Sequence, residues 1–271
     1  RDVGTSDGGS VAWLSAVAAS VSRGRRSDTH RRRPDRSRSV TFLRKNVMEQ
    51  NRWDELRRET ADKLRRVHER IAEAATRSGR TPESVKLVTV TKYVTGAEGM
   101  EAALFDAGCV EFGESRVARL LKKWAFLNEA SQKSDGEIPY PDPRLIKWHF
   151  IGPLQRNKVR RLLPYVSLIH SIDTLELFKT IVRIMREEND PTTRSFPREE
   201  SILPFPKKIP VLLEVNISGE ENKHGFQPES FLEQVAPCFE KRERVEIRGL
   251  MGMGGLASTP DEVRRQFARL R

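Results

Sequence analysis

The sequence alternates between short apolar runs and longer amphipathic runs, and this alternation constrains the fold more than any other feature. The apolar runs, such as VKLVTVTK, are rich in β-branched and aliphatic residues and have the length of buried strands. The runs between them carry apolar residues at helical spacing and often end at glycine. Strict alternation of strands and helices predicts a parallel sheet covered by helices.

One leading helix and six strand–helix pairs are expected. The leading helix covers 53–78, where Leu64, Val67, Ile71 and Ala75 recur at three-to-four spacing and Gly79 follows. The expected strands are 85–92, 109–114, 145–152, 167–173, 209–218 and 245–253. The helices expected after them are 96–108, 115–130, 155–165, 174–189, 228–241 and a last one from about 259.

Two architectures fit this order: an open doubly wound sheet and a (β/α)8 TIM barrel. Six strands suit the open sheet, but no GxGxxG motif follows the first strand. Polar side chains instead gather at the strand ends, which form one active-site mouth in a barrel. We therefore predict an α/β fold, a barrel with about six of eight units and an extra N-terminal helix. The strand-end residues are Lys92, Glu114, Ser115, His149, Ser171, Asp173, Asn216, Ser218 and Met251.

The basic charge of the chain is concentrated at its N-terminal end. The formal net charge is +11, and residues 1–47 supply +7 of it, with eleven Lys or Arg and four Asp. This segment is rich in Arg, Ser and Gly and lacks periodicity, which predicts disorder. It could be a nucleic-acid arm or a targeting segment. Because patterning begins beside Met48, the first methionine, we expect 1–47 to precede the functional start and 48–271 to form the barrel.

Cysteine content and hydropathy argue against a disulfide-rich, metal-binding or membrane-spanning protein. Cys109 and Cys238 are too few for a disulfide framework, and no His/Cys cluster has the spacing of a metal site. A reducing, cytoplasmic setting is the simplest interpretation. No apolar run reaches the ~18 residues of a membrane span. We therefore expect a cytoplasmic protein without a structural metal.

Lys92 places an ammonium group near the end of a strand that otherwise has a buried pattern. Alternate strand residues share a face, so Val88, Val90 and Lys92 are expected to point the same way. If Val88 and Val90 fill the barrel interior, Lys92 points into its mouth, and a neutral lysine amine there could attack an aldehyde. From position alone, a lysine that extends to solvent is the more common case.

Six motifs occur in order, each at or just after an expected strand end: VTVTKYV, FGESRV, WHFIGPLQRNK, HSID, NISGEENKHG and RGLMGM. Together they resemble the YggS/PROSC family of pyridoxal phosphate-binding proteins over about 52–271. The resemblance implies the fold of the N-terminal barrel of alanine racemase, with pyridoxal 5′-phosphate (PLP) as cofactor. It also implies that Lys92 holds PLP as a Schiff base, and that the role is vitamin B6 homeostasis without an established catalytic activity.

The resemblance further implies cofactor contacts for four other residues. Ser115 stands where the family has Asn in an FGEN motif, and serine is shorter but can still donate one hydrogen bond. His149 would pack beside the cofactor ring or be a structural hydrogen-bonding histidine. Asn216 would contact the cofactor or fold its own loop. Met251 would pack its thioether on the ring or simply fill the core.

The resemblance also sets expectations for the whole protein. Family members continue with strands seven and eight and most of the phosphate cradle, so we expect a C-terminally truncated chain that binds PLP weakly or not at all. PLP-dependent apo-enzymes are the expected partners, nucleic acid and membranes are not, and a monomer is the favoured state. The alternative function is a PLP-dependent amino-acid racemase, which requires a second acid–base group across the ring.

Overall fold

The computed structural model describes the backbone of 36–94, 99–133, 138–190, 203–220, 223–240, 244–255 and 258–270, with side chains from residue 50 onward. The chain divides into two units, 1–42 and 43–271. In the first unit only helical backbone from Arg36 is described. The second unit contains the sheet and every side chain discussed below.

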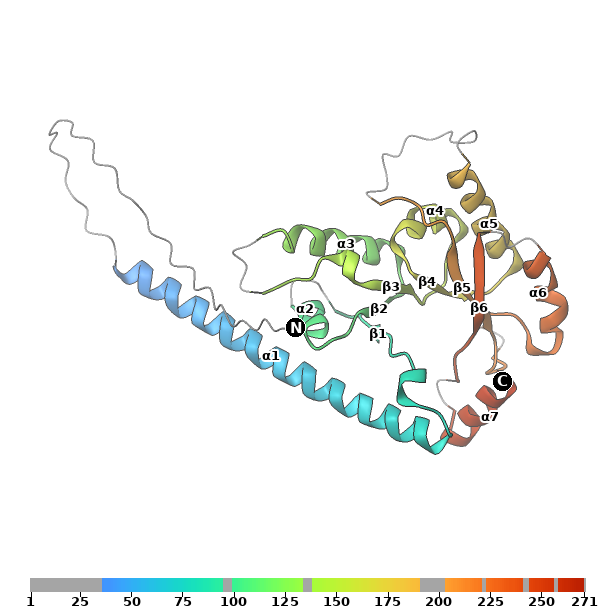
Figure 1. Ribbon diagram of the computed structural model, residues 1–271, viewed down its shortest axis with the longest axis horizontal. Coiled ribbons are helices and arrows are strands. Elements are labelled where there is room, and N and C mark those ends of the chain that lie inside the picture. Colours follow the sequence, from blue (N-terminus) through green and yellow to red (C-terminus); the bar gives the residue numbers. More distant parts are fainter. Residues whose placement is uncertain are drawn as a thin grey trace, which may run out of the picture. The chain divides into compact units, whose positions relative to one another are not determined.

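Six parallel strands form one sheet (Figure 1). Strands that are neighbours in the sheet are neighbours in the sequence, and each neighbouring pair is parallel. A doubly wound sheet reverses its strand order at a switch point, whereas a β/α barrel does not. The order therefore confirms the predicted barrel class, as six units in an open sheet. The strands are β1 (Thr89–Val90), β2 (Glu111–Glu114), β3 (Lys147–Phe150), β4 (Leu168–Ile172), β5 (Ile209–Val215) and β6 (Val245–Gly252).

A helix follows each strand, as the alternating pattern predicts. The fourth is a short turn of α-helix between two 3-10 turns, Arg156–Lys158 and Leu163–Tyr165. The leading helix α1 (Arg36–Arg77) begins inside the segment 1–47 for which composition predicts disorder, and residues 1–35 lie outside the described residues. The other helices are α2 (Met100–Asp106), α3 (Val117–Ala130), α4 (Val159–Leu162), α5 (Leu175–Asn189), α6 (Phe231–Glu240) and α7 (Pro260–Leu270).

The hydrophobic core lies between the sheet and its helices. Phe112 and Trp148 are almost fully buried and pack edge to face, with ring centroids 5.7 Å apart. Strand β5 alternates buried and half-buried residues along its whole length, so one of its faces carries the core. This alternation fixes which strand residues face the helices and which face the opposite side of the sheet.

The first strand differs from its prediction. A strand over 85–92 was expected, but β1 pairs only at Thr89 and Val90. Val90 is 48% exposed, so the condition that Val90 fills a closed interior does not hold in this open sheet. Its register partner on β2 is Gly113, which has no side chain to cover it. The apolar run therefore ends as a short strand with a half-open face.

Candidate functional site

Lys92 lies two residues past β1, in the turn that ends the strand. Thr91 before it is fully buried, Lys92 is half-buried and Tyr93 is 86% exposed. The Thr91 N–H donates to the Gly113 carbonyl at 3.0 Å, and the Val94 N–H donates to the Thr91 carbonyl at 2.9 Å. Lys92 Nζ lies 5.2 Å from the centre of the Tyr93 ring. The amine thus lies at the carboxyl end of β1, on a side chain that keeps part of its surface in solvent.

A buried cluster of charged side chains adjoins this turn. Lys123 Nζ lies 2.7 Å from Glu114 Oε1 and 3.0 Å from Glu101 Oε1. The same Nζ donates to the Thr91 carbonyl at 2.5 Å, and Thr91 Oγ1 donates to Glu114 Oε1 at 3.2 Å. The chain just before Lys92 is thereby held to α2, β2 and α3.

The ends of β2, β3 and β4 meet through Ser115, Gly152 and Ser171. A Cβ on Gly152 would lie 2.3 Å from the Ser115 carbonyl oxygen, so only glycine lets the chain after β3 pass this close. Ser171 Oγ donates to the Gly152 carbonyl at 2.5 Å. The FGES and WHFIG motifs are therefore in direct contact, and Ser115 is half-buried at that contact.

His149 is buried on β3 and both of its ring nitrogens have partners. Nε2 lies 2.5 Å from Glu111 Oε2, and Nδ1 lies 2.8 Å from His170 Nε2. Burial lowers the pKa of His149, although Glu111 opposes this, and burial with the nearby His149 lowers the pKa of His170 to about 4. Both rings are therefore neutral at pH 7. In the matching tautomers, His170 Nε2–H donates to His149 Nδ1 and His149 Nε2–H donates to Glu111.

Glu111 completes this network as its acceptor. Burial opposes its ionisation, but hydrogen bonds from His149, Lys86 and Lys147 outweigh burial and lower its pKa. Lys86 and Lys147 lie 3.2 and 3.3 Å from Glu111 Oε1. The carboxylate is therefore charged and fixes the tautomer of His149.

Asn216 uses its side chain to fold the loop after β5. Its Nδ2 donates to the Glu220 carbonyl at 2.9 Å, and its Oδ1 accepts from Ser218 Oγ and from the Gly219 N–H, both at 3.2 Å. Gly225 closes the loop with φ +118°, where a Cβ would lie 2.8 Å from the Asn216 nitrogen. The contacts of Asn216 match the loop-folding alternative.

Met251 lies half-buried on β6 and pairs in register with Glu214 on β5. Burial raises the pKa of Glu214, the charge of Asp173 adds to the effect, and His224 opposes it. His224 Nδ1 lies 3.4 Å from Asp173 Oδ2. Met251 is therefore the register neighbour of a half-buried carboxyl group on β5.

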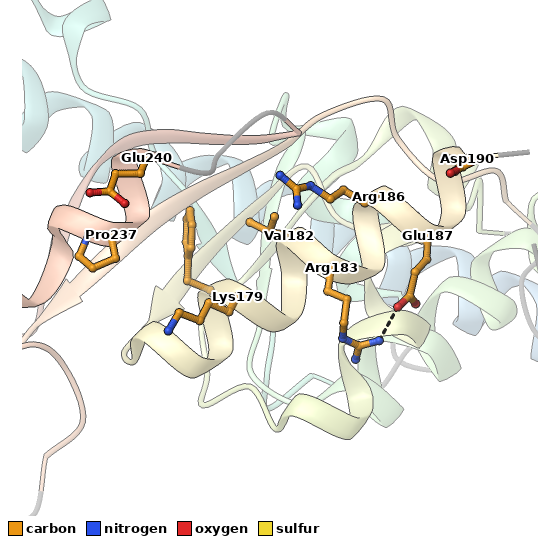
Figure 2. A pocket seen from close by; sticks show the side chains of 9 residues that line it. Lys179, Val182, Arg183, Arg186, Glu187, Asp190, Pro237 and Glu240 are labelled. Atoms are coloured by element: carbon orange, nitrogen blue, oxygen red, sulfur yellow. Dashed lines mark hydrogen bonds and ion pairs between the residues drawn. The ribbon is translucent and has the colours of Figure 1, made fainter. Parts of the chain in front are cut away.

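Pockets open on the described part of this unit, and two of them are relevant here. One, of about 560 Å³, lies at the ends of β3 and β4, where Gln155, Asn157 and Asp173 are among its lining residues. The other, of about 590 Å³, lies between α5 and α6 (Figure 2). Figure 2 shows cationic side chains along α5 and acidic ones at both helices around this second pocket. None of the strand-end residues is among the residues that line it.

The described residues offer neither a metal site nor a membrane-spanning helix. Within the ranges given above, no three His, Cys, Asp or Glu side chains are arranged to hold a metal ion. No helix in the described part of the chain has the length and apolarity to cross a bilayer.

The five predicted site residues occupy one sheet but do not form one hydrogen-bonded site. Lys92 and Ser115 follow the adjacent strands β1 and β2, and His149 lies on β3. Asn216 follows β5, and Met251 lies on the adjacent β6. In the described structure no hydrogen bond or ion pair joins Lys92 to any of the other four. Their roles toward a cofactor remain predictions.

Two residues that lie around the predicted site, Lys123 and His170, were not predicted from the sequence. Lys123 has a signal in the sequence, because it shares the apolar face of a helix with Leu120 and Leu127. His170 lies inside the HSID motif, but nothing local indicates that it meets His149. Such pairings depend on strand register, which the sequence does not supply.

Comparisons with known proteins give one consistent result. A pyridoxal phosphate homeostasis protein of Aquifex aeolicus is 33% identical over 210 residues, covering 78% of this chain and 77% of the relative. The protein of that name from Escherichia coli K12 is 32% identical, covering 76% of this chain and 74% of the relative. The human protein of that name is 31% identical and covers 70% of this chain and 61% of the relative. No family model matches.

Solved structures agree with these relatives. The crystal structure of an unknown protein from Bifidobacterium adolescentis has a TM-score of 0.61 at 31% identity, covering 80% of this chain and 78% of its own. PipY of Synechococcus elongatus, solved with PLP bound, has a TM-score of 0.52 at 28% identity and covers 74% of this chain and 78% of its own. From the identity and coverage of its relatives, this chain belongs to the family of pyridoxal phosphate homeostasis proteins.

Proposed function

We propose that this chain binds PLP in vitamin B6 homeostasis and that Lys92 captures the aldehyde of the cofactor. The observation that carries the proposal is the position of Lys92 at the carboxyl end of β1, the edge where barrel sites form. Its membership of the family and the PLP-bound PipY structure support the choice of ligand. When bound, the cofactor supplies an aldehyde carbon with which a lysine amine condenses, releasing water.

The other predicted residues suit the ring of PLP in different ways. His149 would offer its ring face, because both of its nitrogens already have hydrogen-bond partners. Met251 would add a polarisable thioether. Ser115 would donate one hydrogen bond from the end of β2. Asn216 would act indirectly, by holding the loop after β5 in place.

The proposal extends to a cellular compartment, the cytoplasm, and to the proteins that would receive PLP. Cys109 and Cys238 are free and buried, and burial raises the pKa of Cys238 to about 11, which keeps its thiol unreactive. A reducing cytoplasm therefore suits the chain. Lys92 is half-buried and next to the exposed Tyr93, so PLP-dependent apo-enzymes, the proposed recipients, could reach it.

The first test replaces Lys92 with alanine and follows the visible absorbance of the PLP–lysine adduct during titration with PLP. Because weak binding is expected, the titration extends to a large excess of PLP. The band should then form with the unchanged chain and disappear in Lys92→Ala, because the condensing amine is gone. Lys179→Ala is the matched control, since Lys179 is an exposed lysine on α5, outside the strand ends. A band of undiminished strength in Lys92→Ala would contradict the proposal.

A further inference from the structure

The buried charged cluster beneath Lys92 has no part in the proposed function as stated so far. Lys123 is 4% exposed, and Glu101 and Glu114 are fully buried. The cluster holds two carboxyl groups for one ammonium group. Among the described residues, neither carboxyl oxygen of Glu101 makes a hydrogen bond of good geometry, although Oε1 lies 3.0 Å from Lys123 Nζ.

Such a cluster is not expected to contribute much to the stability of the folded protein. Removing charged groups from water is costly, and replacing a buried ion pair by packed apolar side chains is often neutral or stabilising. The cluster can instead fix the conformation of the backbone next to it. Lys123 Nζ has a short hydrogen bond to one particular backbone oxygen, that of Thr91. A bond of this kind fixes a backbone conformation that apolar contacts would leave less defined.

The bonded oxygen belongs to the residue immediately before Lys92. The Thr91 carbonyl accepts from Lys123 Nζ at 2.5 Å and from the Val94 N–H at 2.9 Å. The Thr91 hydroxyl is held by Glu114 at 3.2 Å. Both the main chain and the side chain of Thr91 are therefore fixed, which sets the direction in which Lys92 leaves the sheet.

We propose that Lys123 is a positioning residue for Lys92. It holds the turn of residues 91–94 so that the Lys92 amine leaves the end of β1 in the orientation that meets the aldehyde. Glu101 and Glu114 hold the Lys123 ammonium in place. The inference rests on the proposed function and names a residue that acts through another rather than on the cofactor itself.

The test measures capture at Lys92 in Lys123→Met, a variant of similar length without the charge. PLP is added, borohydride supplies hydride to reduce the carbon–nitrogen double bond, and peptide mapping follows modified Lys92 over time. A drop of roughly tenfold or more in the rate is expected, because small misplacements of reacting groups have large effects on rate. Amide exchange at Val94 should accelerate as well, since its acceptor loses a fixed position.

Two companion variants separate positioning from stability. Lys123→Met alone would leave Glu101 and Glu114 without their ammonium partner. Adding Glu101→Met removes the carboxyl group that has no other hydrogen bond, whereas Glu114 keeps its bonds from Thr91 Oγ1 and the Ser115 N–H, so this double variant should recover part of the lost stability. It still lacks the bond to Thr91 and should still capture PLP slowly. Leu162→Ala removes a buried core side chain elsewhere and serves as a destabilised control that keeps the Lys123 bond.

The outcomes are distinct. Slow capture in both Lys123 variants, with a near-normal rate in Leu162→Ala, supports positioning. Capture at the unchanged rate in a folded Lys123→Met, or full recovery of rate and stability together in the double variant, overturns it and leaves the proposed function standing. Failure of the unchanged chain to become modified at Lys92 overturns the proposed function and this inference with it.

Discussion

At the scale of single residues, two histidines, His149 and His170, are kept neutral because burial disfavours their charged forms. His149 and His170 share one hydrogen bond, and Glu111 accepts from the other nitrogen of His149. Protonation would turn the shared bond into two opposed N–H donors. The histidine that the resemblance assigns to the cofactor ring is thus already part of a structural network.

This network predicts a loss of stability in weak acid. The pKa of His170 falls from 6.5 to about 4 on folding, so between these pH values the unfolded chain binds more protons than the folded chain. The free energy of unfolding should therefore decrease as pH falls from 6.5 toward 4. The share of His170 is about 1–2 kcal/mol once its partial exposure is allowed for.

Urea unfolding across this pH range checks the prediction with His170→Gln, which cannot titrate but can still donate to His149. The variant should show a flatter dependence on pH than the unchanged chain. His224→Gln is the control, because His224 lies on an exposed loop. Parallel curves for the unchanged chain and His170→Gln would show that this pair is not the source.

At the scale of elements, the close contact between the ends of β2 and β3 depends on Gly152. Alanine there would place a methyl group 2.3 Å from the Ser115 carbonyl and force the two segments apart. Gly152→Ala should cost about 1–3 kcal/mol of unfolding free energy. Thermal or urea unfolding measures the loss.

Gly254→Ala is the matched control for Gly152→Ala. The nearest atoms to a Cβ at Gly254 are the two methyl groups of Val263, at 3.3 and 3.4 Å. Because this side chain can move, a smaller loss is expected. Equal losses at the two positions would contradict the claim that the Ser115 backbone sets the constraint.

The elements themselves were largely predictable because they depend on local periodicity. All six strand–helix pairs fall within a few residues of their expected positions. The first strand was predicted too long. VKLVTVTK has the composition of a strand along its whole length, but a segment forms a strand only where a neighbouring strand pairs with it. β2 pairs with β1 over two residues only. Strand length is set by the partner strand, which the composition of one segment does not contain.

At the scale of the whole molecule, the strand order agrees with the barrel class that the sequence predicts in preference to a doubly wound sheet. Consecutive order from β1 to β6 brings the ends of all six strands to one edge of the sheet. The resemblance named Lys92 and four companions at that edge. The network of Glu111, His149 and His170 and the cluster around Lys123 appear only once distant segments are paired in space.

The measurement that tests the central claim most directly is the site of PLP attachment in the unchanged chain. After mixing with an equal amount of PLP and reduction with borohydride, every lysine is scored by peptide mass spectrometry. Lys92 should carry most of the modification. Lys223 is the informative competitor, because its amine already bonds to Glu220 and to the Gly254 carbonyl. Preferential labelling of Lys223, or an even spread over the lysines, would contradict the assignment of Lys92.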